Sequence, residues 1–191
     1  MEKFKNKYRI ASARATWWNY GWAGAYFITI CTQNREHFFG EIKNYRINLS
    51  RVGVIADILW HEIPYHAKNV ELGSFVVMPN HIHGILILTE NNTNTVETLR
   101  VETLHATSLQ QKNQNKTMSA ISPKPDTVSA IIRSYKSAVT KHANRLGFTN
   151  GWQSRFHDHI IRNDAEYQRI NDYIETNPSN WENDVFFAQE E

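Results

Sequence analysis

Hydrophobic residues recur along this chain at two different spacings, and the alternation of the two predicts the order of its secondary-structure elements. Four short segments are rich in β-branched and aromatic residues, as strands usually are. Residues 37–48 are expected to form a short hairpin or an irregular excursion. The predicted strands cover residues 25–32, 70–77, 81–88 and 155–162.

Apolar residues at helical spacing predict three helices, which are flanked by residues that typically begin or end a helix. Ser50 can cap the first helix, and Pro64 is expected to close it. Gly147 should stop the second, and Asn163 with Glu166 forms a capping-box-like start for the third. The predicted helices cover residues 50–63, 127–146 and 164–176.

The predicted order of elements is strand, helix, strand, strand, helix, strand, helix. This is the ferredoxin-like (RRM-like) split βαβ pattern, an α+β fold with an antiparallel sheet and helices on one face, followed by a C-terminal helix that bears a tyrosine. The short link between residues 70–77 and 81–88 predicts an antiparallel hairpin deep in the sheet.

Length and composition fit one globular domain with flanking segments. The chain has 191 residues, of which 41% are hydrophobic, and its formal net charge is +2. We expect a basic aromatic arm over residues 1–24, a folded domain over 25–181 and an acidic tail over 182–191. Residues 90–126 are rich in Asn, Thr, Gln and Ser, and we expect a low-complexity insertion there.

Cysteine usage and hydropathy bear on the compartment. The single cysteine, Cys31, excludes an intrachain disulfide and fits a reducing environment. The longest apolar run, residues 85–88, is far too short to span a membrane, and no apolar run follows the basic N-terminus as in a secretory signal. We therefore expect a cytoplasmic protein with no membrane partner.

His81 and His83 are the sharpest local signal for chemistry. Residues i and i+2 of a strand point to the same face, so the two imidazoles should lie side by side and could share one metal ion. Ile82 should then pack on the opposite face. Imidazole is a common ligand of divalent transition metals. The alternative is a pair of partly exposed histidines on a polar face of the sheet.

The last predicted helix offers a third ligand and a nucleophile. Tyr173 and Asn177 lie four residues apart, so they project from one side of that helix and could face the histidines. Tyrosine can act as a covalent nucleophile, and a divalent ion can polarise a phosphodiester. In the alternative, Tyr173 is a core aromatic and Asn177 caps the helix before Pro178.

Three motifs in this order carry a resemblance to a known family: FVVMPNHIHGILIL, WQSRFHDHIIR and DYIETNPSNW. They resemble the single-tyrosine HUH transposases of small bacterial insertion sequences (the insertion sequence 200-like group), and look closest to the REP-associated tyrosine transposases. KYRIASARATWWNY and GAYFITICTQNREHFFGEI resemble the start of such proteins. The likeness covers nearly the whole chain except residues 90–126.

The resemblance implies a DNA transposase or strand-transferase that cleaves and rejoins single-stranded DNA through a 5′-phosphotyrosine intermediate. The family's nucleophile falls on Tyr173, its histidine pair on His81 and His83, and its amide ligand on Asn177, a shorter residue than the glutamine of other members. The resemblance also implies Mg²⁺ or Mn²⁺ as cofactor, single-stranded or hairpin DNA as partner, and a homodimer. In some members the tyrosine helix serves the partner's active site.

The helix predicted over residues 127–146 offers a basic face for DNA. Its basic residues lie away from the apolar arc, with no acid among them. Phosphates attract such cations without sequence selectivity, although a merely solvated helix face is an equal alternative. The candidate DNA contacts are Arg133, Lys136, Lys141 and Arg145.

Other residues and functions stay open. Tyr135 is the rival nucleophile, although its place within an apolar arc predicts burial. Asp158 and His159 could orient a ligand or the phosphate, or form a structural pair. The chain could also be a non-catalytic, domesticated protein that binds hairpin DNA or RNA, or a metallohydrolase that uses water and forms no protein–DNA adduct.

Overall fold

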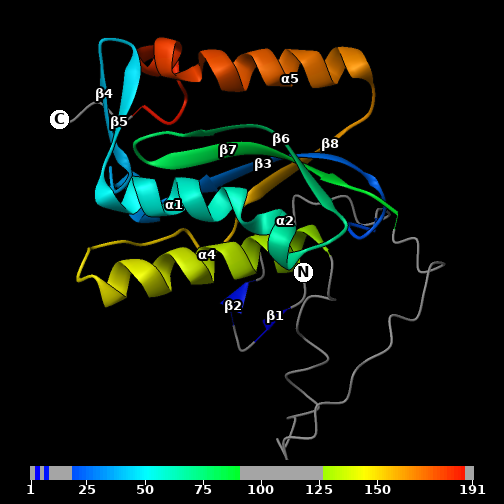
Figure 1. The fold of residues 1–191 in the computed structure, drawn as a ribbon, viewed down its shortest axis with the longest axis horizontal. Helices are drawn as coiled ribbons and strands as arrows, with labels where there is room; N and C mark the ends of the chain where they lie inside the picture. The colour runs from blue at the N-terminus through cyan, green and yellow to red at the C-terminus, as the bar shows by residue number, and fades with distance from the viewer. Residues whose placement is uncertain (1–2, 5–6, 9–18, 91–126, 188–191) are drawn as a thin grey trace, which may run out of the picture.

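A four-stranded antiparallel sheet is the centre of the fold in the computed structural model, which describes residues 3–4, 7–8, 19–90 and 127–187 (Figure 1). Its strand order is β6-β7-β3-β8. The connections between these strands give the ferredoxin-like arrangement that the sequence pattern predicts. The strands are β3 (Gly24–Cys31), β6 (Val70–Val77), β7 (His81–Leu88) and β8 (His157–Ile161).

Parts of the expected domain organisation lie outside the described residues. These parts are the insertion from residue 91 onward, most of the N-terminal arm and the last four residues of the tail. Within the described part of the chain, no helix is long and apolar enough to cross a membrane.

β6 lies at the edge of the sheet, so the expectation of a hairpin deep in the sheet is right only for β7. The two strands pair antiparallel as predicted, but β7 also pairs with β3 along its whole length. β6 is less regular, because its register shifts between Leu72 and Phe75. The polar side chains of Glu71 and Ser74 suit an edge position, where bulges are also common.

The first helix is shorter than expected, and Pro64 does not close it. Ser50 caps α1 (Arg51–His61), because its side chain accepts a hydrogen bond from the backbone N–H of Gly53. Pro64 instead lies near the start of a second short helix, α2 (Ile63–His66). Proline is tolerated there because the first helical N–H groups have no partner within the helix.

The two later helices follow their sequence signals closely. α4 (Val128–Arg145) ends before Gly147, whose φ of +76° is a left-handed conformation that favours glycine. α5 (Asp164–Thr176) begins at Asn163, whose side chain accepts from the backbone N–H of Glu166 at 2.9 Å. The Glu166 carboxylate accepts in turn from the backbone just before the helix, which resembles the predicted capping box.

Small elements complete the described chain. The excursion expected over residues 37–48 contains a hairpin, with Asn44 and Tyr45 at positive φ in its two-residue turn. The elements are β1 (Lys3–Phe4), β2 (Lys7–Tyr8), the 3₁₀ helix η1 (Gln33–Arg35), β4 (Gly40–Lys43) and β5 (Arg46–Leu49).

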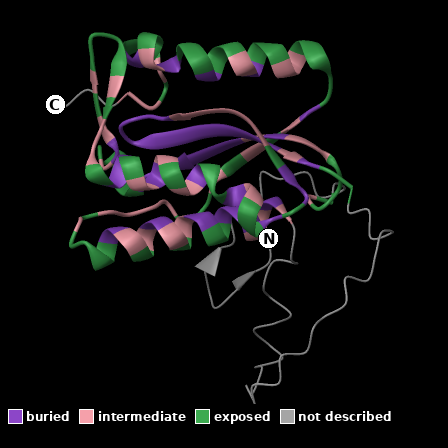
Figure 2. Cartoon of the chain, viewed as in Figure 1, coloured by how far each residue is buried: buried purple, intermediate pink, exposed green. Residues whose placement is uncertain are grey.

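Helices cover both faces of the sheet, and its two central strands, β3 and β7, are mostly buried (Figures 1 and 2). α1, α2 and α4 lie over one face and enclose the larger core, which includes Trp60 and Ile82. The last helix, α5, lies over the opposite face. Beneath it is a small core of Ile85, Ile161, Ile170 and Ile174. Because Ile82 belongs to the larger core, the predicted histidines must lie on the opposite face of the sheet, which α5 covers.

Candidate active site

His81 and His83 lie side by side on the face of β7 that α5 covers. Their ring centroids are 4.5 Å apart, and both residues are at most 1% exposed. The alternation of β7 places Ile82 in the larger core on the other face, as predicted. The burial contradicts the alternative of partly exposed histidines on a polar face.

A hydrogen bond fixes which nitrogen of His81 carries its proton. Its Nδ1 lies 2.9 Å from Oδ1 of Asn80, and the amide of Asn80 is oriented because its Nδ2 donates to the carbonyl of Phe186 at 2.8 Å. A carbonyl oxygen only accepts, so Nδ1 of His81 must donate. Nε2 of His81 therefore carries a lone pair. His83 is held similarly, with its Nδ1 2.9 Å from Oγ1 of Thr29 on the neighbouring strand.

Both imidazoles are neutral at neutral pH. Burial, together with the smaller effects of the charges of His83 and Arg35, lowers the pKa of His81 to about 2. Burial also lowers the pKa of His83 to about 4, although the carboxylate of Asp184 acts in the opposite direction. Neutral imidazole is the form that binds metal ions, so the pair is ready to act as ligands.

Tyr173 of α5 reaches these histidines within one chain. Its hydroxyl lies 3.2 Å from Nε2 of His83, and its ring packs edge-on against Phe27 of the sheet. The residue is 40% exposed, which contradicts the alternative of a core aromatic. Tyr173 therefore contacts the buried histidine pair and also meets solvent.

Asn177 lies one turn after Tyr173, where α5 passes into the 3₁₀ helix η2 (Asn177–Asn183). It is the C-cap of α5, as the alternative had it, but its side chain is 2% exposed and faces the site. Its Nδ2 donates to Oδ2 of Asp184 at 2.6 Å. The predicted ligand is therefore in place beside a carboxylate that sequence reasoning missed.

Asp184 brings that carboxylate to the histidine pair. One ligand atom each of His81, His83 and Asp184 lies within 4.8 Å of the others. The Tyr173 hydroxyl also donates to Oδ2 of Asp184, at 3.3 Å. The sequence predicts an acidic tail over residues 182–191. The aromatic residues Trp181 and Phe186, which flank Asp184, instead pack against His81.

The segment that holds Asp184 is fastened over the histidines. Arg35 donates to the carbonyl of Val185 at 3.0 Å, and Asn80 donates to that of Phe186. The Phe186 ring lies over His81, with centroids 4.5 Å apart. These contacts hold the segment against the buried histidine pair.

Two buried polar atoms at this site have no hydrogen-bond partner among the described residues: Nε2 of His81 and Oδ1 of Asn177. Both carry lone pairs, and leaving such atoms unpaired costs about 1–3 kcal/mol each. A divalent cation would satisfy both at once. The side chains present therefore fit a metal ion.

The Tyr173 hydroxyl is protonated in this arrangement. Burial raises its pKa to about 12, and the negative charge of Asp184 and the hydrogen bond to it act in the same direction. A positive ion beside the hydroxyl would act in the opposite direction.

No family model matches the chain. Over 178 residues, the chain is 35% identical to an uncharacterized protein of Haemophilus influenzae, a match that covers 93% of this chain and 92% of the other. The chain belongs to the family of this Haemophilus protein.

Solved structures show which fold the Haemophilus family has. A REP-associated tyrosine transposase bound to a REP hairpin matches with a TM-score of 0.55 and 20% identity, over 90% of this chain and 74% of the other. A putative transposase from Deinococcus radiodurans matches with a TM-score of 0.39 and 15% identity, over 88% and 96%. The first likeness establishes a common fold: an antiparallel four-stranded sheet with helices.

The rival tyrosine is not available for chemistry in this family member. Tyr135 is 3% exposed, and its hydroxyl donates to the carbonyl of Ala56 at 2.8 Å. His159 pairs with the capping carboxylate of Glu166 at 2.8 Å, on the exposed side of β8. This pairing favours a structural role for His159 over a role at the metal.

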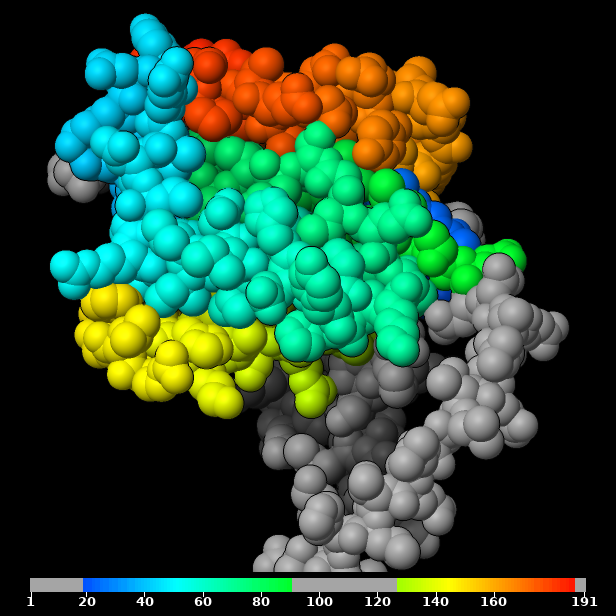
Figure 3. Space-filling view, in the orientation of Figure 1, coloured from blue at the N-terminus to red at the C-terminus, as the bar shows by residue number. Residues whose placement is uncertain are grey.

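The basic residues of α4 lie on the other side of the sheet from the histidines and α5 (Figure 3). Arg133, Lys141 and Arg145 are exposed. Lys136 is half-buried, and its ammonium donates to the carbonyl of Gln153 at 2.7 Å. The structure therefore brings His81, His83, Tyr173 and Asn177 together but leaves the four cations apart from them.

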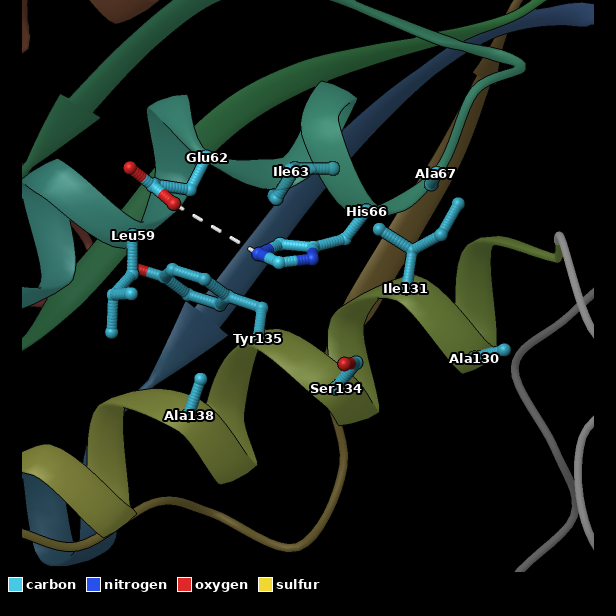
Figure 4. Close-up of a pocket in the computed structure, with 10 residues that line it drawn as sticks. All are labelled: Leu59, Glu62, Ile63, His66, Ala67, Ala130, Ile131, Ser134, Tyr135 and Ala138. Carbon is cyan, nitrogen blue, oxygen red and sulfur yellow. Dashed lines mark ion pairs between the residues drawn. The ribbon is translucent and has the colours of Figure 1, made fainter. Parts of the chain in front are cut away.

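A pocket of about 180 Å³ opens between α1, α2 and α4 (Figure 4). Its walls are mainly apolar, and an ion pair between His66 and Glu62 crosses one side at 3.9 Å. None of the predicted site residues lines it. The pocket and the histidine pair therefore lie on opposite faces of the sheet.

Proposed function

We propose that this protein is a metal-dependent transposase or strand-transferase that cleaves and rejoins single-stranded DNA. One observation carries the proposal: the Tyr173 hydroxyl lies 3.2 Å from a buried, neutral histidine whose neighbour has an unpaired lone pair. The fold shared with a tyrosine transposase that was solved with a REP hairpin supports it. Hairpin-bearing single-stranded DNA is the proposed partner.

In the proposed reaction, the hydroxyl oxygen of Tyr173 attacks the phosphorus of a phosphodiester. A bond forms between that oxygen and phosphorus, and the bond from phosphorus to the 3′-oxygen breaks. The tyrosine proton leaves toward the carboxylate of Asp184, which already accepts from the hydroxyl, and the departing 3′-oxygen takes up a proton. The product is a 5′-phosphotyrosine and a free 3′-hydroxyl. Attack by another 3′-hydroxyl reverses the step and joins the strands.

The proposed cofactor is Mg²⁺ or Mn²⁺, with His81, His83 and Asn177 as ligands. When bound, such an ion polarises the phosphate and stabilises the charge that develops on it. The protein itself orients the ligands. Thr29 and Asn80 hold the imidazole rings in orientation, as partners of ligating histidines commonly do.

The exposed cations of α4, Arg133, Lys141 and Arg145, are the proposed contacts to the DNA backbone outside the site. Lys136 is also proposed as a DNA contact, although its ammonium donates to the carbonyl of Gln153 in this structure. Because the face lies across the sheet from Tyr173, it would hold the hairpin or a flanking strand and not the phosphate under attack.

The test is formation of a covalent adduct. Purified protein is incubated with Mg²⁺ or Mn²⁺ and end-labelled, hairpin-bearing single-stranded DNA, and the products are separated on a denaturing gel. Tyr173→Phe should abolish the adduct, whereas Tyr167→Phe, on the same helix, should retain it. Cleavage without an adduct indicates a water-using metallohydrolase. Tight binding without cleavage under either metal indicates the non-catalytic alternative.

A further inference from the structure

The carboxylate of Asp184 occupies a place that the proposed ligand set leaves open. It lies with the two imidazoles in one group whose ligand atoms are all within 4.8 Å of each other. Ligands of a single divalent ion, each about 2.0–2.3 Å from it, lie somewhat closer together than this. A small inward movement around an ion is enough to close the group.

Charge is the reason to look for an acid here. Two neutral imidazoles and an amide would surround a dication with no negative charge, in a buried site where uncompensated charge is costly. Asp184 supplies one negative charge at the correct position. Its own surroundings offer hydrogen bonds from Asn177, from the Tyr173 hydroxyl and from the Phe186 backbone N–H at 2.7 Å, and no cation is paired with it in the described residues.

The hydrogen bonds at Asp184 also hold it in position. Asn177 donates through Nδ2 to Oδ2 of the carboxylate, which leaves the buried Oδ1 of Asn177 unpaired. The amide can therefore serve the ion with its oxygen and the carboxylate with its nitrogen. The Phe186 backbone fixes the other carboxylate oxygen. This is the support that a ligating carboxylate normally receives.

We propose that Asp184 is a ligand of the metal ion, together with His81, His83 and Asn177. The inference rests on the proposed function, because it assigns a ligand for the ion which that function requires. The proposal also extends the active site to the segment after η2, which the sequence predicts to be an acidic tail, because Asp184 lies in that segment.

Metal affinity, measured without DNA, tests this inference directly. Mn²⁺ is titrated into the purified full chain, and free Mn²⁺ is followed by electron paramagnetic resonance. Asp184→Asn, which keeps the acceptor for the Phe186 N–H, should weaken binding by at least about 10-fold, the lower end of the loss seen even for indirect partners of a metal. Glu182→Gln removes an exposed acid from the same segment and should leave the affinity unchanged.

A thiolate in place of the carboxylate separates ligation from a purely electrostatic effect. In a Cys31→Ala background, Asp184→Cys should acquire a thiolate-to-metal charge-transfer absorption when Cd²⁺ is added, because cysteine prefers soft metals. Glu182→Cys in the same background should show none. A spectrum of Asp184→Cys identical to that control would place Asp184 outside the ligand set.

The two proposals fail in different ways. Wild-type protein that forms the adduct while Asp184→Asn binds Mn²⁺ as tightly as wild type overturns the Asp184 assignment and leaves the transposase proposal standing. Loss of Mn²⁺ binding in Asp184→Asn, with no adduct formed by wild type on any hairpin substrate, supports the ligand and removes the function. Wild type that binds no Mn²⁺ removes both.

Discussion

The hydroxyl of Tyr173 and Nε2 of His83 lie 3.2 Å apart within a single chain. A metal ion bound by that nitrogen would use its lone pair, so the nitrogen could not then also hydrogen-bond to the hydroxyl. Under the proposed function, a metal ion bound at His83 would exclude this contact and leave the hydroxyl bonded to Asp184.

A complete site within one chain predicts that inactive variants do not rescue each other. Tyr173→Phe keeps the metal ligands, and His83→Ala keeps the tyrosine. Mixtures of the two should form no adduct, because neither chain has both. Restored adduct on a denaturing gel would instead show that α5 serves a partner's site, as the resemblance allows in a homodimer. The homodimer itself stays a prediction, and sedimentation of the same mixtures measures it.

The two buried histidines predict that the metal-free protein loses stability as the pH falls. Unfolded histidine titrates near 6.5, whereas the folded pKa values are about 2 and about 4. Between pH 6.5 and 5 the unfolded chain binds protons that the folded chain refuses, so acid favours unfolding. Each histidine adds up to about 1.4 kcal/mol per pH unit.

Urea unfolding in EDTA, followed by circular dichroism from pH 7 to 5, measures this dependence. The double variant His81→Gln with His83→Gln should flatten the slope, because glutamine does not titrate. His37→Gln, which replaces an exposed histidine, is the matched control and should keep the wild-type slope. Equal slopes in all three proteins would show that the imidazoles are accessible to protons.

The cations of α4 should differ in what they contribute. Neutralising Arg133, Lys141 and Arg145 together should weaken DNA binding and lower the slope of log affinity against log salt by about 2, for single-stranded contacts. Lys136→Gln should mainly lower the free energy of unfolding, by about 1 kcal/mol, because its ammonium is bonded to Gln153. Fluorescence anisotropy at several salt concentrations, with thermal melts, separates the two effects. Unchanged salt dependence in the triple variant would remove this face from the DNA interface.

Gly84 should tolerate no side chain, because it lets β7 lie directly on Trp60. A Cβ at Gly84 would lie 2.3 Å from Cζ2 of this fully buried tryptophan. Gly84→Ala should cost about 1–3 kcal/mol of unfolding free energy. It should also weaken Mn²⁺ binding, since His83 precedes it in the strand. Gly21→Ala, where the new atom would make only ordinary contacts, should change stability by less than about 0.5 kcal/mol. Equal melting temperatures for the two variants would contradict this close packing.

Local signals made most of the fold predictable. β7 was predicted to the residue because its apolar run is bounded by a turn, and α5 because Asn163 and Glu166 mark its start. The same alternation that defines β7 placed His81 and His83 together. The prediction that Pro64 closes the first helix was wrong, because a proline near a helix start cannot be distinguished, in sequence, from one that ends the preceding helix.

Asp184 could not be predicted from local pattern. Its role depends on the chain turning back after Asn177, so that a residue near the C-terminus meets a strand from the middle of the sequence. Contacts of this kind are set by packing of Trp181 and Phe186 against the histidines, and neither periodicity nor capping encodes such a meeting. The burial of Lys136 was missed for the same reason, since its partner Gln153 belongs to another segment.

The small core beneath α5 has a consequence for how this protein would stop working. Tyr173, Asn177 and Asp184 all follow Arg162, on the part of the chain that leaves β8, whereas both imidazoles stay with the sheet. Detachment of α5 would expose mainly the small core and could precede loss of the larger one. Mild heat or denaturant should therefore separate Tyr173, Asn177 and Asp184 from the two imidazoles in a single step, while the sheet remains intact.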